Sequence, residues 1–97
     1  MTDAAVRYVR QVEVVWRLAP DRVLVRRPWP KDGQDEAADL LGLAALIWIA
    51  LDEPGTVTDL VERLADAGDA TEGVVSADVT DTLDQLLATG WVELAQP

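Results

Sequence analysis

The order of apolar and polar positions divides the chain into strands followed by helices. Between Val12 and Leu18 apolar and polar side chains alternate, and this period of two predicts a strand with one buried and one wet face. The segment Ala19–Arg22 has turn chemistry, and a second alternating stretch predicts a strand from Arg22 to Arg27. The two strands are therefore expected to form a hairpin, with Tyr8 and Val9 as a backward extension of the first strand.

The segment from Gln34 to Leu41 is ambiguous on pattern alone. Pro28 and Pro30 end the hairpin pattern because proline lacks the N–H that a sheet ladder needs. The alanines and carboxylates that follow favour a helix continuing to Leu51. The same residues also fit a third strand from Glu36 to Leu40, and the pattern leaves both readings open.

Three helices are predicted in the second half of the chain. The residues from Gly42 to Asp52 are almost wholly apolar, so a helix there is either central in the core or covered by a partner on its second side. A second helix is capped by Thr56, with Asp59 in the capping-box position. A third helix is capped by Ser76 and ends at Gly90.

Strands that precede helices indicate an α+β domain with the helices on one face of a small antiparallel sheet. A short loop between the second and third helices makes the arrangement winged-helix-turn-helix-like, with a three-stranded antiparallel sheet followed by three helices. Residues 1–11 are expected to form an N-terminal arm or strand extension, and residues 12–95 a single domain. Trp91, Val92 and Leu94 are expected to form an extended tail that packs on the core.

Composition removes most catalytic chemistry. The 97 residues include no histidine and no cysteine, which excludes zinc fingers, disulfides and the Cys–His and Ser–His nucleophile pairs. Asp78, Asp81 and Asp84 lack the glycine and terminal glutamate of a calcium loop, so we interpret them as a solvated helix face. The sequence therefore predicts a protein that is not an enzyme and holds no metal or cofactor.

The charge is large and unevenly distributed. The formal net charge is −10; residues 1–31 contain seven basic and three acidic residues, whereas residues 32–97 contain Arg63 against fifteen acidic residues. Nucleic-acid affinity depends on neutralising phosphates, so a chain this acidic is a poor general binder. The longest apolar stretch, Leu40 to Leu51, is 12 residues, short of the about 20 that a membrane span needs. With no targeting segment apparent, a cytoplasmic protein is expected.

The run from Gly42 to Val61, GLAALIWIALDEPGTVTDLV, resembles the PqqD-like family of peptide-recognition domains, also called RiPP recognition elements. The third-helix segment from Asp78 to Leu87, followed by Gly90, is similar to the family's final helix. The segments Val15-Trp16-Arg17 and Asp21-Arg22-Val23-Leu24-Val25 are similar to its opening hairpin. The resemblance covers about Val12 to Val92 and rests on the ordered set of motifs.

This resemblance implies that residues 36–41 form a third strand that leads directly into the first helix. It implies that the leader region of a ribosomally made precursor peptide adds as a further strand to the edge of that strand. The domain would then present the precursor to a separate modifying enzyme in peptide natural-product biosynthesis.

The implied peptide-binding residues lie on the third strand and the third helix. On the strand they are Glu36, Ala37, Ala38, Asp39, Leu40 and Leu41, and on the helix they are Val79, Thr82, Leu83 and Leu86. Arg26 and Arg27 of the hairpin, beside the acidic strand, complete the set and predict a leader of mixed charge.

Two alternatives stay open. A winged-helix regulator that binds DNA would place basic residues on its recognition helix, where this chain has Asp78, Asp81 and Asp84. An interaction subunit would instead cover a partner through the apolar first helix. The oligomeric state is also open, and a homodimer is one of the alternatives.

Overall fold

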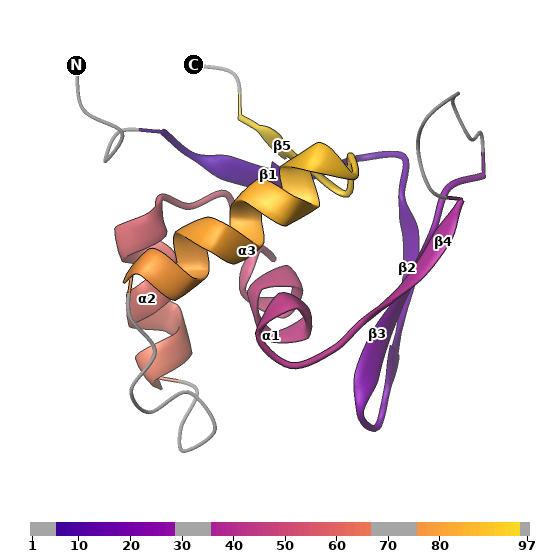
Figure 1. The fold of residues 1–97 in the computed structure, drawn as a ribbon, viewed down its shortest axis with the longest axis horizontal. Helices are drawn as coiled ribbons and strands as arrows, with labels where there is room; N and C mark the ends of the chain where they lie inside the picture. The colour runs from indigo at the N-terminus through magenta and orange to yellow at the C-terminus, as the bar shows by residue number, and fades with distance from the viewer. Residues whose placement is uncertain (1–5, 29–35, 67–75, 96–97) are drawn as a thin grey trace.

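The hairpin and the segment after the prolines form one antiparallel sheet (Figure 1). The computed structural model describes residues 6–28, 36–66 and 76–95. The described elements are, in chain order, β1 (Tyr8–Arg10), β2 (Val15–Ala19), β3 (Arg22–Arg26), β4 (Ala37–Leu40), α1 (Leu43–Ala50), α2 (Val57–Asp66), α3 (Ser76–Ala88) and β5 (Val92–Leu94). The three-stranded antiparallel sheet and the three helices confirm the predicted α+β class.

The sheet has the order β2-β3-β4, with one face toward the helices. Val25 lies opposite Trp16 on one side and Ala38 on the other, so these three side chains share the inner face. Val23 and Val25 are fully buried because α1 packs against β3. The ambiguous segment is therefore a strand, since Ala37–Leu40 pairs with β3 in a continuous register.

The predicted buried face of the first strand is present only at Val14, which is buried but precedes β2. Trp16 is 38% exposed and Leu18 is 63% exposed, although both belong to the inner face of the sheet. Strand β2 is the edge strand on the far side of β3, and α1 packs on β3. Apolar and polar residues still alternate along this edge strand, but the strand extends beyond the helices, so its apolar side chains stay exposed.

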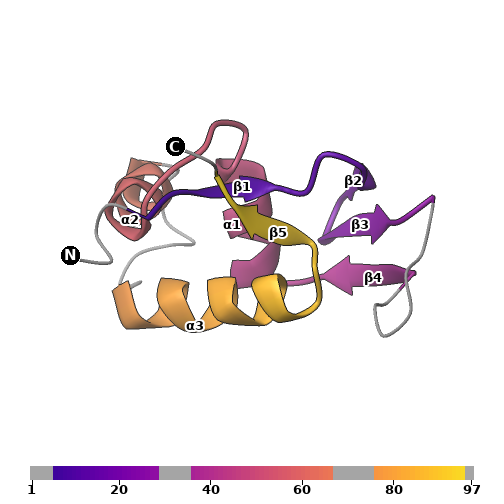
Figure 2. The same cartoon turned by 90° about the horizontal axis from the view of Figure 1, so that it is seen from above.

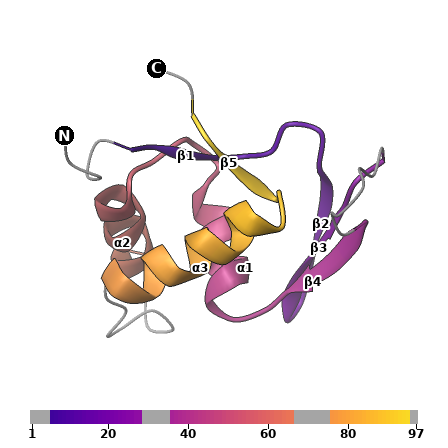
Figure 3. The same cartoon turned by 45° about the horizontal axis from the view of Figure 1, so that its top comes forward.

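The predicted backward extension of this strand by Tyr8 and Val9 is wrong. Strand β1 pairs with β5 in a separate two-stranded ribbon that runs over the helices (Figure 3). Tyr8 is held further by Gly55, through N–O distances of 2.8 and 3.1 Å between the two backbones. The carboxyl-terminal tail is thus a strand, and its Trp91 and Val92 are buried in the core as expected.

The apolar helix α1 is central, in contact with α2, α3 and β3. Ala45, Ile47 and Trp48 are buried, whereas Ile49 on another side of the helix is 42% exposed. Gly42 enters the helix with φ +56°, a left-handed conformation that favours glycine. Among the described residues no helix is long and apolar enough to cross a membrane.

The predicted capping box at the start of α2 is confirmed. The Thr56 backbone N–H donates to Asp59 Oδ2 and the Asp59 N–H donates to Thr56 Oγ1, each at 3.0 Å. The bond from the Thr56 N–H favours the charged carboxylate and lowers the pKa of Asp59 below its ordinary value. The predicted end of this helix at Gly68 lies outside the described residues.

Helix α3 ends in a Schellman turn. The Gly90 N–H donates to the Leu87 carbonyl and the Trp91 N–H donates to the Leu86 carbonyl, both at 3.0 Å, which is the paired arrangement of that motif. Gly90 has φ +81°. The turn reverses the chain into β5 and carries the buried Trp91 back against Leu86.

We expect Gly90→Ala to lower the free energy of unfolding by about 1–2 kcal/mol, because a side chain at a left-handed position is strained. Urea unfolding followed by tryptophan fluorescence measures this. Gly90→Asn is the matched control, since asparagine adopts this conformation more readily and should lose less. Equal losses in the two variants would contradict a conformational origin.

Candidate functional site

A groove separates the free edge of β4 from α3. Figure 2 shows β4 as the strand of the sheet nearest to α3. The groove encloses a cavity of about 250 Å³ and is lined by Ala38, Asp39, Leu40, Leu41, Ala44, Thr82, Gln85, Leu86, Thr89 and Trp91. It therefore brings together six of the residues predicted from the sequence, four from the strand and two from the helix.

The backbone of β4 presents unpaired groups toward this groove. The Arg27 N–H donates to the Glu36 carbonyl at 2.7 Å, in the same register as the β3–β4 ladder. Opposed residues alternate between bonded and non-bonded pairs in an antiparallel ladder, so Ala38 and Leu40 bond to β3. Ala37 and Asp39 direct their N–H and C=O groups outward, and no other described strand pairs with them.

The floor of the groove is apolar and the rest of the lining is more polar. Leu40, Leu86 and Trp91 are buried, and Thr82, Gln85 and Thr89 contribute hydroxyl and amide groups from α3. The floor suits an apolar side chain, and the strand edge suits an extended backbone.

The remaining predicted site residues do not line the groove. Val79 and Leu83 are fully buried in the core, on the inner side of α3. Glu36 and Ala37 are exposed at the start of β4. Arg26 is exposed on the outer face of the sheet, opposite Val15 and Ala37.

Arg27 lies behind the groove and anchors α3. The residue is only 7% exposed, and its guanidinium donates to the Gly90 carbonyl at 3.0 Å and to the Thr89 carbonyl. The guanidinium carbon lies 4.2 Å from the ring centre of Trp91. Arg27 thus satisfies two carbonyls of the turn that follows α3, and its contacts are structural.

Two further arginines bind carbonyls near the end of α1. Arg10 donates to the Trp48 carbonyl at 2.8 Å and the Ile49 carbonyl at 3.2 Å, and burial lowers its pKa below the ordinary value. Arg63 donates to the carbonyls of Ala50, Glu53 and Pro54. Sequence reasoning missed this use of arginine, because partners 38 residues apart leave no local signal.

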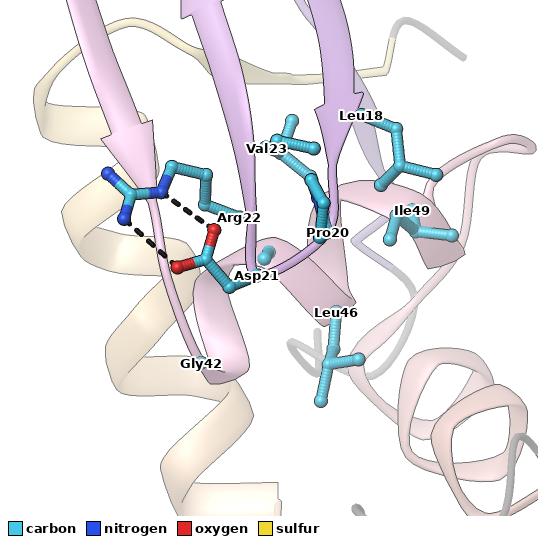
Figure 4. Close-up of a pocket in the computed structure, with 10 residues that line it drawn as sticks. Leu18, Pro20, Asp21, Arg22, Val23, Gly42, Leu46 and Ile49 are labelled. Atoms are coloured by element: carbon cyan, nitrogen blue, oxygen red, sulfur yellow. Dashed lines mark hydrogen bonds and ion pairs between the residues drawn. The ribbon is translucent and has the colours of Figure 1, made fainter.

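A second pocket lies between the β2–β3 hairpin and α1 (Figure 4). It has a volume of about 260 Å³, and Leu18, Leu46 and Ile49 project around it. On its rim Arg22 pairs with Asp21 at 3.0 Å, and with Asp39 at 2.9 Å. The bond from Arg22 lowers the pKa of Asp21 below its ordinary value.

A third pocket of about 560 Å³ lies on the sheet and is lined by Arg26, Ala37, Ala38 and Asp39 among others. The linings of the three pockets contain no histidine or cysteine. In residues 6–28, 36–66 and 76–95 no three acidic side chains come together as a metal site. The described polar groups of the groove are hydroxyls, an amide, a carboxylate and the backbone edge of β4. This chemistry is suited to binding a chain segment.

Comparison with known protein families shows to which family this chain belongs. The family model for coenzyme PQQ synthesis protein D (PqqD) matches residues 31–92, well over half of the chain. The chain belongs to the PqqD family. The match includes β4, the three helices and the first residue of β5, so both walls of the groove lie within it. No curated protein and no solved structure matches the chain.

Membership of the PqqD family confirms the resemblance that the ordered motifs predicted. It identifies the chain as a peptide-binding protein of biosynthesis. The β2–β3 hairpin precedes the matched segment. In this member of the PqqD family the hairpin segment contributes Arg27 and the strand to which β4 is bonded.

We expect Arg27→Ala to lower the free energy of unfolding by about 2–3 kcal/mol, since it leaves the two carbonyls of the turn after α3 unpaired and removes the cation–π contact with Trp91. Arg17→Ala is the control; Arg17 is exposed on β2, so its loss should change stability by less than about 0.5 kcal/mol. Urea unfolding measures both. An Arg27→Ala protein as stable as Arg17→Ala would show that the contact does not hold α3.

Proposed function

We propose that this PqqD-family protein is a non-catalytic peptide chaperone. The leader region of a ribosomally made precursor peptide pairs with β4 as a further strand and occupies the groove beside α3. The observation that supports this most directly is the outward backbone edge of β4, which at Asp39 borders a groove with an apolar floor.

Strand addition matches both features of the groove. An extended peptide supplies the N–H and C=O groups that the outer edge of β4 lacks, which provides affinity largely independent of sequence. Alternate side chains of the added strand then point toward α3. An apolar side chain at such a position would contact Leu40, Leu86 and Trp91, which provides selectivity.

The chemistry on the precursor is assigned to a separate modifying enzyme. The chain has no histidine or cysteine, and no described nucleophile–base pair lies in the groove. A domain that holds the leader while it contacts the enzyme raises the effective concentration of the precursor at the active site. This role requires binding and release, with no bond made or broken by the chaperone.

The DNA-binding alternative gains no support from α3. The helix carries Asp78, Asp81 and Asp84 and no lysine or arginine. Contacts between these carboxylates and phosphates would be repulsive.

We expect Asp39→Pro to weaken leader binding at least about tenfold, because proline removes an outward N–H that a paired peptide would use. Fluorescence polarisation with labelled leader peptides from precursors encoded beside this protein measures the change. Asp39 is preferable to Leu40, whose N–H bonds to β3, so proline at position 40 would damage the sheet itself.

Asp39→Ala is the matched control. It removes the same carboxylate and the ion pair with Arg22 but retains the N–H, so affinity should stay within about threefold of the unsubstituted protein. Circular dichroism confirms that both variants are folded. Equal affinity of folded Asp39→Pro and Asp39→Ala for the leader would contradict strand addition to β4.

A second candidate, docking of a partner protein through α1, is favoured by one observation. Leu18 and Ile49 stay exposed around the hairpin pocket, on the side of α1 away from its buried residues. Most of α1 is covered by the fold itself, so only this part of the helix is available. The two candidates are compatible, because the pocket and the groove use different surfaces.

We expect Ile49→Asp to weaken association with the modifying enzyme about tenfold or more if that enzyme docks at the pocket, because a carboxylate would be buried against apolar groups. Leader affinity should not change. The control is Leu94→Asp, which alters a similarly exposed leucine (47%) on β5. Co-elution with the enzyme encoded beside this protein measures the association of each variant. If Ile49→Asp and Leu94→Asp associate equally well with the enzyme, the pocket is not the docking site.

A further inference from the structure

The charged side chains near the groove are almost all acidic. β4, α1 and α3 contain no lysine or arginine. On α3, Asp78 lies one helical turn before Thr82 and Asp81 one turn before Gln85, so both carboxylates continue the helix side that lines the groove. Both aspartates are exposed. The α3 rim, defined here as Asp78 and Asp81, therefore presents two negative charges.

The arginines near the sheet do not neutralise this rim. Arg22 pairs with Asp21 and Asp39, Arg26 is exposed on the outer face opposite Ala37, and Arg27 is buried at the end of α3. Among the described residues no ion pair involves Asp78 or Asp81. Arg26 lies across Ala37 from the free edge of β4, on the side of those side chains of an added strand that point away from α3. The acidic rim lies on the side of those that point toward α3.

The acidic rim lies on α3 before the residues of that helix that line the groove. The start of β4 lies near the end of α3, because Arg27 bonds both the Glu36 carbonyl and the carbonyls of Thr89 and Gly90. The rim belongs to the first half of α3 and so lies toward the opposite end of β4. A bound strand would pass from the apolar floor to the acidic rim along its length.

We infer that the groove selects extended segments that carry lysine or arginine on one side of an apolar residue. The inference rests on the proposed function, because it takes the groove as the peptide site and adds the charge of its ligand. Complementary charge across a groove favours such segments and disfavours acidic ones. Each exposed pair should change affinity by about twofold to fivefold.

The test uses the leader peptide that binds in the Asp39 experiment as a framework. Two residues on one side of its apolar residue, and then on the other, are set to Lys, Gln or Glu, and dissociation constants are measured by fluorescence polarisation. For one of the two sides we expect the Lys form to bind about tenfold more tightly than the Glu form at about 50 mM salt. The ratio should fall at about 500 mM salt, where exposed charges are screened.

Matched variants distinguish the effect of the α3 rim on peptide affinity from the effect of the overall negative charge of the protein. Asp81→Lys should remove or reverse the preference for Lys. Asp84→Lys makes the same change three residues after Asp81 but about 200° around the helix axis from the groove residue Thr82, and should retain more of the preference than Asp81→Lys. Asp78→Asn, which leaves a residue compatible with the first turn of α3, should reduce the preference about twofold to fivefold.

The outcomes distinguish this inference from the proposed function. If the Glu form binds as tightly as the Lys form on both sides while Asp39→Pro still weakens binding, the charge inference is wrong and strand addition stands. Equal effects of Asp81→Lys and Asp84→Lys would also overturn it, because the preference would then reflect net charge alone. If Asp39→Pro binds the framework peptide normally, the proposed function itself fails.

Discussion

The contact between Arg27 and the end of α3 determines how the two walls of the groove meet. Arg27 follows β3, to which β4 is bonded, and its guanidinium binds the carbonyls of Thr89 and Gly90 while it covers Trp91. The two carbonyls belong to the turn after Ala88, the last residue of α3. One buried side chain therefore joins the sheet to the helix and helps to hold β4 beside α3.

Alternating apolar residues predicted burial correctly only where another element of the fold covers the strand. Val23 and Val25 alternate along β3 and are buried because α1 packs on that strand. The same alternation on β2 gave the wrong burial for Leu18, since an edge strand beyond the helices has no layer to cover it. The identity of β4 came from the resemblance, because its alanine-rich, acidic residues favour helix over strand.

The sequence predicted which residues lie near the site, but not which of their side chains and backbone groups point into it. Helical spacing groups Val79, Leu83 and Leu86 on one side of α3, yet only Leu86 reaches the groove, because the direction of β4 relative to the helix is a tertiary property. The role of Arg27 depends on carbonyls more than 60 residues away in the chain. The outward direction of the Asp39 N–H follows from the register with β3, which no sequence pattern specifies.

Amide hydrogen exchange of β4, resolved by residue with and without a saturating leader peptide, tests the central claim most directly. Strand addition predicts that the Ala37 and Asp39 amides, which face outward, gain strong protection in the complex. The amides of Ala38 and Leu40, already bonded to β3, should change much less. Outward amides that stay unprotected at saturation, or protection that appears on β2 instead, would contradict binding at the β4 edge.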